Sequence, residues 1–350
     1  MAVNQKRVFY VNRLAAQTFA DVLAERPDVR LDKLTNDTTD TEYTANLDGA
    51  HGYQIGASRG ELQPRWFGDA ALLAQARNLL VVSSGGAGYD TIDVDACTAA
   101  GVLAVNQAGG NAEGVAEHAL ALMLNLTKRI METDRYMRRL ADIPKNDFMG
   151  RNLEEKTVGL IGIGHVGRRV AEMVKIVFNA RVLAYDPYLS AAEIAARGAE
   201  KTDLATLLHE ADFVSVHCPR TKESYMLMGT PQFAMMKPSA YFVNTARGGI
   251  HDEAALAEAL AAKQIAGAGL DVWDPEPPDP AHPLLSFDNV IASPHTAGIT
   301  RESRDNIAHI AGVQMLDILD GKRPPRLLNP EVWPAYAARF ERVMGFKPEA

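Results

Sequence analysis

Short apolar runs alternate with amphipathic windows along most of this chain. In the first hundred residues, strands are expected at Arg7–Val11, Leu79–Ser83 and Leu103–Asn106, with a helix at Asp69–Ala76. Further strand-like runs lie at Thr157–Gly162, Arg181–Tyr185, Phe213–His217, Tyr241–Asn244, Gly267–Asp271 and Val290–Ser293. Strands that alternate with helices indicate βαβ units. The pattern therefore predicts an α/β protein built on parallel sheets.

Two longer stretches show helical spacing. Apolar residues recur every three or four positions from Ala112 to about Arg139, and a second helix is expected over Arg301–Leu319. Five prolines between Asp274 and Pro283 predict a rigid loop. The final segment, Leu327–Phe346, carries proline and aromatic residues, so we expect it to pack on another part of the protein.

Length and composition narrow the class of protein. A chain of 350 residues has room for about two domains, and its 47% hydrophobic and 23% charged residues are typical of globular proteins. The net charge of −8 argues against a nucleic-acid-binding protein. About six strands between residues 157 and 293 are enough for a complete dinucleotide-binding domain.

The cysteines and apolar runs bear on compartment and metal binding. Cys97 and Cys218 cannot form a disulfide framework, which favours a reducing cytoplasm, and they cannot supply the usual ligands of a zinc site. No apolar run approaches the length of a membrane span, and the N-terminus lacks the uninterrupted apolar region of a secretory signal. We therefore expect no metal, no membrane partner and no nucleic-acid partner.

The segment Gly162-Ile163-Gly164-His165-Val166-Gly167 is a G-x-G-x-x-G motif. It follows an apolar strand and opens a helical window, which is the context of a dinucleotide-binding loop. Asp186 stands about 20 residues further on, at the end of a strand, where an acid binds the adenosine ribose. Such an acid would repel a 2′-phosphate, so NAD is favoured over NADP. The alternative is an ordinary glycine turn in which Asp186 only caps the turn before Pro187.

Three polar segments stand where expected strands end. They are Asn244–Gly249, Asp271–Glu276 and Ser293–Gly298. Because open parallel sheets bind ligands at the carboxyl ends of their strands, Arg247, Glu276 and His295 could converge. A histidine suits proton transfer, a carboxylate fixes its tautomer, and an arginine grips a substrate carboxylate. Taken singly, each is more typical of a surface or capping residue. A serine hydrolase is disfavoured because none of these three segments carries a G-x-S-x-G motif.

These motifs together resemble the D-isomer-specific 2-hydroxyacid dehydrogenase family. VGLIGIGHVGRRVA and MMKPSAYFVNTARGGIHDEAALAEAL are similar to its two signatures, and GLDVWDPEP and SPHTAG to its glutamate and histidine motifs. The segments GAGYDTIDVDACTAAGVLAVN and NAEGVAEHALALML resemble the region that links its two domains. The likeness runs from about Leu79 to Leu328.

The resemblance implies a role for each site residue. His295 is the acid/base, Glu276 its partner and Arg247 the substrate clamp, while the amides of Gly86, Ala87 and Gly88 hold the substrate carboxylate. The cofactor contacts that it implies are Gly162, Gly164 and Gly167, with His165 and Val166 at the pyrophosphate, Asp186 at the ribose, Cys218 and Pro219 at the adenine, Thr245, Ala246, Arg247 and His295 near the nicotinamide, Asp271 on its carboxamide, and the backbone of Gly298. Arg59, in the loop Gly56–Arg65, could add an anion contact but is more typical of a solvated residue.

The family architecture is also implied by the resemblance. It comprises two doubly wound parallel-sheet domains: a discontinuous flavodoxin-like substrate domain, residues 1–108 and 299–350, and a Rossmann NAD-binding domain, residues 109–298. Family members are usually homodimers that are joined through their cofactor domains, which suits the helix expected from Ala112.

Other functions within this fold stay open. A formate dehydrogenase is disfavoured because that subfamily carries glutamine at the position of Glu276, whereas a phosphite dehydrogenase keeps the same catalytic types. A non-catalytic NAD-sensing corepressor also keeps the three residue types of Arg247, Glu276 and His295. Such corepressors carry a long tail, whereas only about 20 residues follow Pro330 here. The same short end disfavours a feedback-regulated phosphoglycerate dehydrogenase. The physiological 2-hydroxy acid is not defined by these motifs.

Overall fold

The computed structural model describes residues 5–139 and 144–349, which fall into two compact units. Unit 1 consists of Met1–Asn111 with Thr300–Ala350, and unit 2 of Ala112–Ile299. Unit 1 is therefore built from two segments that are distant in the sequence. The resemblance implies boundaries at 108/109 and 298/299, while the units divide at 111/112 and 299/300.

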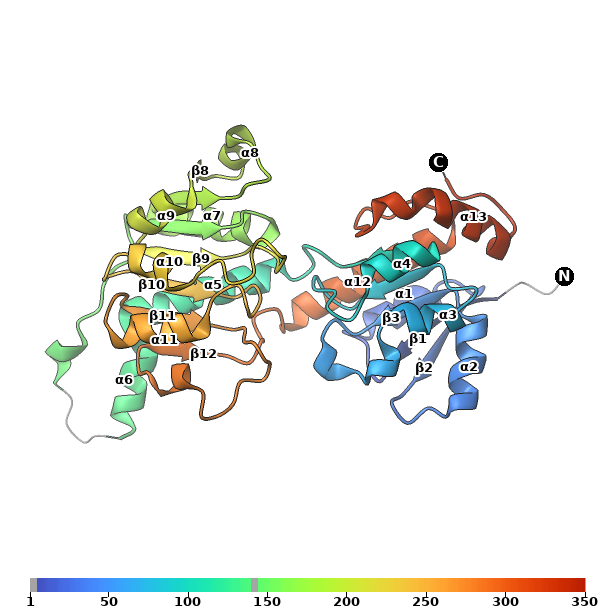
Figure 1. Ribbon diagram of the computed structural model, residues 1–350, viewed down its shortest axis with the longest axis horizontal. Coiled ribbons are helices and arrows are strands. Elements are labelled where there is room, and N and C mark those ends of the chain that lie inside the picture. Colours follow the sequence, from blue (N-terminus) through green and yellow to red (C-terminus); the bar gives the residue numbers. More distant parts are fainter. Residues whose placement is uncertain (1–4, 140–143, 350) are drawn as a thin grey trace. The chain divides into compact units, whose positions relative to one another are not determined.

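A parallel sheet of five strands forms the centre of unit 1, in the order β2-β1-β3-β4-β5 (Figure 1). This order is that of flavodoxin-like sheets. The strands are β1 Lys6–Val11, β2 Val29–Leu34, β3 Gly52–Ile55, β4 Val81–Ser84 and β5 Leu103–Val105. Every residue of β3, β4 and β5 is buried, as expected for parallel strands that are covered on both faces.

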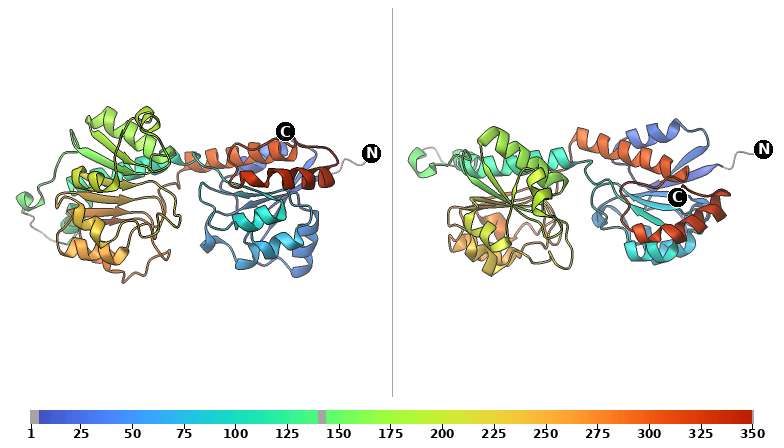
Figure 2. Two further views of the ribbon diagram at one scale, coloured as in Figure 1. Left: turned by 45° about the horizontal axis from the view of Figure 1, so that its top comes forward. Right: turned by 90° about the horizontal axis from the view of Figure 1, so that it is seen from above.

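Helices cover both faces of this sheet (Figure 2). One face packs against α2, α3 and α4 around Tyr53 and Trp66, and the other against α1, α12 and α13 around Val81 and Leu103. The helices are α1 Thr18–Ala24, α2 Asp40–Gly49, α3 Ala70–Gln75, α4 Val94–Ala100, α12 Arg301–Leu319 and α13 Trp333–Met344, with the 3-10 turns η1 Arg59–Glu61, η2 Pro64–Trp66 and η5 Pro330–Val332.

The C-terminal segment packs on this sheet, which confirms the prediction from its aromatic residues. In α13, Tyr336 and Phe340 are fully buried among residues of β1, β4 and β5. Arg339 donates hydrogen bonds to the carbonyl oxygens of Leu79 at 2.7 Å, Ala76 at 2.9 Å and Ala100 at 3.1 Å. The last helix therefore also binds backbone carbonyls that belong to the first hundred residues.

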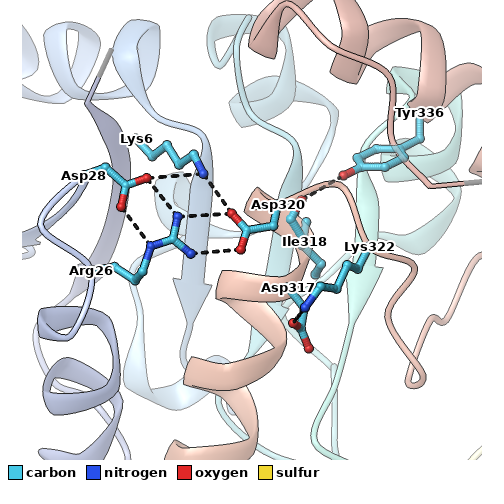
Figure 3. Close-up of polar contacts among 8 residues, drawn as sticks. All are labelled: Lys6, Arg26, Asp28, Asp317, Ile318, Asp320, Lys322 and Tyr336. Atoms are coloured by element: carbon cyan, nitrogen blue, oxygen red, sulfur yellow. Dashed lines mark hydrogen bonds and ion pairs between the residues drawn. The ribbon is translucent and has the colours of Figure 1, made fainter. Parts of the chain in front are cut away.

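An ionic cluster joins the two ends of the sequence in unit 1 (Figure 3). Arg26 binds Asp28 at 2.9 Å and Asp320 at 2.8 Å, and Lys6 Nζ lies 3.0 Å from Asp320 Oδ1 and 3.4 Å from Asp28 Oδ2. The hydrogen bond from Arg26 lowers the pKa of Asp28 to about 2, and the same arginine lowers the pKa of Asp320. The cluster links β1 and the start of β2 to the end of α12.

Replacing Arg26 by methionine is expected to lower the free energy of unfolding by about 1 kcal/mol at neutral pH, since partly exposed ion pairs contribute roughly 0.2–1 kcal/mol each. A carboxyl whose pKa is lowered on folding stabilises the fold fully at pH values above its unfolded-state pKa of 3.8. This stabilisation disappears as the pH falls towards the folded-state pKa of about 2. The difference between Arg26→Met and wild type should therefore shrink between pH 4 and pH 2. Urea unfolding at several pH values measures it, and a difference independent of pH would contradict the assignment.

Unit 2 contains a parallel sheet of seven strands in the order β12-β11-β10-β9-β6-β7-β8 (Figure 1). The order reverses between β6 and β9, which is the switch point of a Rossmann-type sheet. The strands are β6 Thr157–Ile161, β7 Arg181–Tyr185, β8 Glu200–Lys201, β9 Phe213–Val216, β10 Tyr241–Asn244, β11 Gly267–Leu270 and β12 Val290–Ala292.

Two hydrophobic clusters lie on the two faces of this sheet. One contains residues of α5, α7 and α8, and the other residues of α9, α10 and α11. The helices are α5 Ala112–Lys128, α6 Ile130–Met137, α7 His165–Phe178, α8 Ala191–Ala196, α9 Leu204–Glu210, α10 Thr230–Met235 and α11 Glu253–Ala261, with the turns η3 Lys145–Phe148 and η4 Pro283–Ser286. Together, the two parallel-sheet units confirm the predicted α/β class.

The single helix predicted from Ala112 to about Arg139 was wrong in its second half. The helix ends at Lys128, Arg129 adopts a left-handed conformation with φ of 54°, and a new helix, α6, begins at Ile130. Arg129 is held there by two hydrogen bonds of its guanidinium to Glu132, each 2.6–2.7 Å long. The apolar spacing continues through the break, so periodicity alone could not reveal it.

Three strands escaped the sequence prediction. β2 is an edge strand with charged residues at half of its positions, β3 is short and contains Gln54, and β8 has only two residues. Unit 2 therefore has seven strands where about six are expected. The proline-rich stretch from Asp274 to His282 contains neither helix nor strand, as predicted.

Candidate active site

The glycine loop joins β6 to α7 and has the geometry of a dinucleotide-binding turn. Gly162 has a φ of 89°, and a Cβ there would lie 2.8 Å from the amide nitrogen of Cys218. A Cβ at Gly167 would lie 2.4 Å from the carbonyl oxygen of Gly162, so only glycine lets the helix pack against the loop. A Cβ at Gly164 would meet no described atom within 4 Å. The loop therefore leaves open space at Gly164, where a pyrophosphate could approach the first amides of α7.

Asp186 lies directly after β7, beside this loop. Its Oδ2 accepts a hydrogen bond from the amide of Ile163 at 3.3 Å, and its Oδ1 accepts one from the amide of Tyr188 at 3.1 Å. Asp186 therefore does cap the turn before Tyr188, which is the alternative role considered for it. This role does not compete with cofactor binding, because a carboxylate has about four acceptor positions and these bonds use two.

The other predicted cofactor residues surround the loop in unit 2. His165 and Val166 are the first residues of α7, and Val166 packs against the hydrophobic core. Cys218 and Pro219 follow β9, and the carbonyl of Pro219 accepts a hydrogen bond from a neighbouring serine. Burial raises the pKa of the Cys218 thiol to about 11, so this side chain offers a neutral, weakly polar surface.

The structure brings His295 and Glu276 into direct contact. Nδ1 of His295 lies 2.8 Å from Oε2 of Glu276, and both side chains are half-buried. Burial raises the pKa of the Glu276 carboxyl, but the hydrogen bond and charge of His295, with the charge of Arg247, lower it more. The net pKa of Glu276 is below its usual value, so the glutamate is ionised at neutral pH.

Asp271 shapes the loop that carries His295. Its carboxylate is fully buried and accepts hydrogen bonds from Ser293 Oγ at 2.6 Å, Thr296 N at 2.8 Å and Ala297 N at 2.9 Å. Its carbonyl oxygen accepts one from the amide of His295 at 2.7 Å. These bonds hold His295 at a φ of 57°, a left-handed conformation that is uncommon for residues other than glycine. Gly298 follows at the end of this loop.

Sequence reasoning missed two residues that support the pair. His118 of α5 places Nε2 3.0 Å from Ser293 Oγ, and Trp273 donates its ring N–H to the carbonyl of Ser293 at 3.0 Å. The amide of Trp273 also donates to Oε1 of Glu276 at 3.0 Å. A single histidine within the apolar helix of residues 112–128 was the available signal for His118.

The loop after β10 positions Arg247. The side chain of Asn244 donates to the carbonyl of Arg247 and to Nδ1 of His251, both at 3.0 Å, and accepts from the amide of Ala246 at 2.9 Å. The buried hydroxyl of Thr245 has no hydrogen-bond partner within the described chain. Buried polar groups are usually hydrogen-bonded, so this hydroxyl is available to bond to a cofactor bound at the same sheet.

In unit 1, the predicted substrate loop Gly86–Gly88 has its carbonyls bonded and its amides unbonded. The carbonyls of Gly86, Ala87 and Gly88 are bound by the amide of Gln107 at 2.9 Å, the side chain of Asn106 at 2.7 Å and the hydroxyl of Ser84. Within residues 5–139 and 144–349, no acceptor engages the three amides of this loop. Amides without an acceptor of their own can donate to a bound anion such as a carboxylate.

Arg59, the second candidate anion contact, is held on unit 1. Its Nε donates to the carbonyl of Asp90 at 2.8 Å, and its guanidinium lies 5.1 Å from the centre of the Phe67 ring. No group of three or more potential metal ligands occurs among the described residues. No described helix is both long and apolar enough to cross a membrane.

Comparisons with known proteins identify relatives of this chain in sequence and in structure. The sequence model of the D-isomer specific 2-hydroxyacid dehydrogenase NAD binding domain matches residues 120–297. A D-3-phosphoglycerate dehydrogenase of Archaeoglobus fulgidus is 42% identical over 279 residues, which are 79% of this chain and 52% of that protein. A glyoxylate reductase of Thermofilum pendens is 40% identical over 268 residues, covering 75% of this chain and 79% of the relative.

A solved structure matches as well. The NAD-complexed D-isomer specific 2-hydroxyacid dehydrogenase from Lactobacillus delbrueckii ssp. bulgaricus is 27% identical, covers 93% of this chain and 100% of its own, and has a TM-score of 0.76. The chain spans about half the length of the phosphoglycerate dehydrogenase that it matches.

A Rossmann-type sheet with this glycine loop is typical of a dinucleotide-binding domain. The chain belongs to the D-isomer specific 2-hydroxyacid dehydrogenase family. The match confirms the family resemblance and the predicted Rossmann domain. It also confirms NAD as the cofactor that the glycine loop predicted.

Proposed function

We propose that this protein transfers a hydride between NAD(H) and a small D-2-hydroxy acid or its 2-keto acid. The observation that supports this most is the 2.8 Å contact between His295 and Glu276. The pair follows β11 and β12, at the sheet edge where parallel sheets bind ligands. Bound NAD(H) supplies or accepts the hydride, and the accompanying proton transfer falls to residues of this chain.

His295 carries the proton. Glu276 occupies Nδ1, which leaves Nε2 as the ring nitrogen that faces the substrate oxygen. The ionised glutamate favours the protonated imidazole, and this form donates a proton to the keto oxygen during reduction. In the oxidative direction, the neutral imidazole removes the hydroxyl proton.

The substrate carboxylate is bound by two kinds of donor. The guanidinium of Arg247 can bind a carboxylate with a planar pair of N–H groups, and the amides of Gly86–Gly88 can donate to it without side-chain charge. Within each loop, local hydrogen bonds fix the backbone carbonyls.

The cofactor is bound mainly through backbone and one carboxylate. Asp186 accepts from the adenosine ribose hydroxyls and would repel a 2′-phosphate. Because one charge-assisted hydrogen bond contributes roughly 1.5–3 kcal/mol, we expect NADH to be preferred over NADPH by at least about tenfold in kcat/KM. The further contacts that we propose are Gly162, Gly164, His165, Val166, Gly167, Cys218, Pro219, Thr245, Ala246, Arg247, Asp271, His295 and Gly298.

Assays of NADH and NADPH oxidation with glyoxylate, hydroxypyruvate, pyruvate and bulkier 2-keto acids test this function. We expect turnover of at least one of these acids with NADH. Binding of NADH without turnover of any acid would favour an NAD-sensing protein of the corepressor type. Reduction of NAD by formate or phosphite, without 2-keto acid activity, would favour a dehydrogenase for those donors.

We also propose that the protein is a homodimer joined through unit 2. The helix α6 buries none of its side chains, and it exposes Ile130 and Met137, with Met149 exposed nearby in the sequence. Burying these large apolar side chains against a second copy would remove them from water. We expect wild type to be a dimer by light scattering and Met137→Glu to shift it towards monomer. The matched change Val313→Glu, on unit 1, should leave the dimer intact, and a monomeric wild type would contradict the proposal.

We also propose that the protein works in the cytoplasm. Cys97 and Cys218 are both free thiols, which a reducing compartment preserves. Fractionation of cells that produce the protein tests this, and recovery from an oxidising compartment would contradict it.

A further inference from the structure

The catalytic glutamate stands on a segment that has no secondary structure of its own. Glu276 lies in the stretch from Asp274 to His282, which forms neither helix nor strand. Its contact with His295 nevertheless requires placement within a few tenths of an ångström. Contacts from outside the segment must therefore supply this placement.

Glu253, at the first position of α11, makes two of these contacts. Its Oε1 accepts a hydrogen bond from the amide of Asp274 at 3.0 Å, and its Oε2 lies 3.0 Å from Nε2 of His282. Its side chain is 14% exposed and that of His282 is 20% exposed, so water competes weakly for both groups. One carboxylate thus holds both ends of the segment that carries Glu276.

The hydrogen bonds of His282 define its tautomer. Nδ1 accepts a hydrogen bond from the amide of Leu284 at 3.3 Å, so the ring proton is on Nε2 and is donated to Glu253. The neutral ring therefore satisfies both nitrogens. It also packs edge-on against Trp273, with ring centres 5.6 Å apart.

Trp273 transmits this placement to the catalytic pair. Its amide donates to Oε1 of Glu276, and its ring N–H donates to the carbonyl of Ser293, two residues before His295. A second contact on the same segment is the ion pair of Arg220 and Asp274 at 3.3 Å, with side chains 40% and 43% exposed. The Arg220 contact is more exposed than that of Glu253 and is therefore the weaker anchor.

We propose that Glu253 is a positioning residue for catalysis: through Asp274, His282 and Trp273 it fixes Glu276 against His295. The inference rests on the proposed function for its kinetic consequence, but the placement itself can be measured without turnover. Among the described residues, Glu253 forms no hydrogen bond or ion pair with His295 or Glu276, so its effect on the reaction has to pass through the segment.

The kinetic test compares three variants on α11. Glu253→Ala is expected to lower kcat by about 10–100-fold, because a misplacement near 1 Å can cost about that much. The KM for the 2-keto acid and the Kd for NADH should change by less than about threefold. Glu253→Gln keeps an acceptor for the Asp274 amide and should retain at least a third of the wild-type kcat. Glu258→Ala, the same change at an exposed position of α11, should behave as wild type.

A double-mutant cycle separates positioning from general damage. If Glu253 acts through Glu276, then Glu253→Ala should cost little in a Glu276→Gln background, so the two effects will not add. Fully additive effects would overturn the proposal. A kcat for Glu253→Ala that matches Glu258→Ala would overturn it too. Should Glu253→Ala fail to fold, His282→Phe, which keeps a ring on Trp273 and removes the donor, replaces it.

Amide hydrogen exchange measures the placement directly in the cofactor-free protein. In Glu253→Ala, peptides spanning 273–282 should exchange at least about tenfold faster than in wild type, with α11 itself unchanged and Glu253→Gln intermediate. Unchanged exchange in this segment would overturn the proposal whatever the kinetics. If the wild-type protein reduced no 2-keto acid, the proposed function would fail while this exchange result would still decide the role of Glu253.

Discussion

Alanine in place of His295 is expected to lower the rate of 2-keto acid reduction by about 10²–10⁴-fold, the usual contribution of one positioned acid/base. NADH binding should remain within a few-fold of wild type, since the glycine loop and Asp186 lie on other strands of the sheet. Stopped-flow turnover and fluorescence titration with NADH measure the two quantities. Equal losses in rate and in NADH affinity would mean that His295 acts in binding rather than in proton transfer.

The same pair predicts a pH dependence with a definite sign. Reduction needs the protonated imidazole, so kcat/KM falls as the pH rises and that form is lost. Burial raises the pKa of Glu276, but His295 and Arg247 lower it by more, so Glu276 is ionised and its negative charge lies beside the ring. Glu276→Gln removes the charge, so the falling limb should move to lower pH. If the falling limb of the kcat/KM profile stays in place or moves to higher pH, Glu276 does not act on His295.

Two glycine substitutions should differ in their effect on folding and agree in their effect on cofactor binding. Gly167→Ala places a methyl group 2.4 Å from the carbonyl oxygen of Gly162, a backbone atom that cannot easily move. We expect a lower Tm together with a loss of NADH affinity of more than about tenfold. Gly164→Ala meets nothing within 4 Å, so Tm should be unchanged.

Gly164→Ala should still weaken NADH binding by about tenfold or more, because its methyl group would fill the space left for the pyrophosphate. Calorimetry and thermal unfolding of both variants provide the comparison. If Gly164→Ala bound NADH as wild type does, the open position would not be the cofactor cradle.

Local sequence signals predicted the framework of unit 2 well because its strands are buried runs of apolar residues. The strands at Arg181–Tyr185 and Tyr241–Asn244 have the predicted bounds, and Arg301–Leu319 in unit 1 is the predicted helix. The edge strand Val29–Leu34 was missed because one side of it faces solvent, so its composition resembles that of a loop. Periodicity also could not locate the break at Arg129, where a local salt bridge stabilises a left-handed residue.

The sequence could predict site residues that directly follow a strand. It could not predict residues whose role depends on partners far away in the sequence. The contact of Glu276 with His295 was expected because both follow neighbouring strands. The burial of Asp271 beneath the histidine loop was not, since four hydrogen bonds from residues more than twenty positions away decide it. His118 escaped for the same reason, because its partner is 175 residues away.

The assembly of unit 1 from two distant segments sets an order of events during synthesis. The sheet of the first hundred residues lacks α12 and α13 until the last part of the chain has been made, and Val81 and Leu103 lack their covering residues until then. At about 5–20 residues per second, the ribosome needs roughly 10–40 s to make Ala112–Ile299 in between. Unit 2 can therefore fold first, although it begins later, and the waiting N-terminal sheet is the part of the nascent protein that most needs a chaperone.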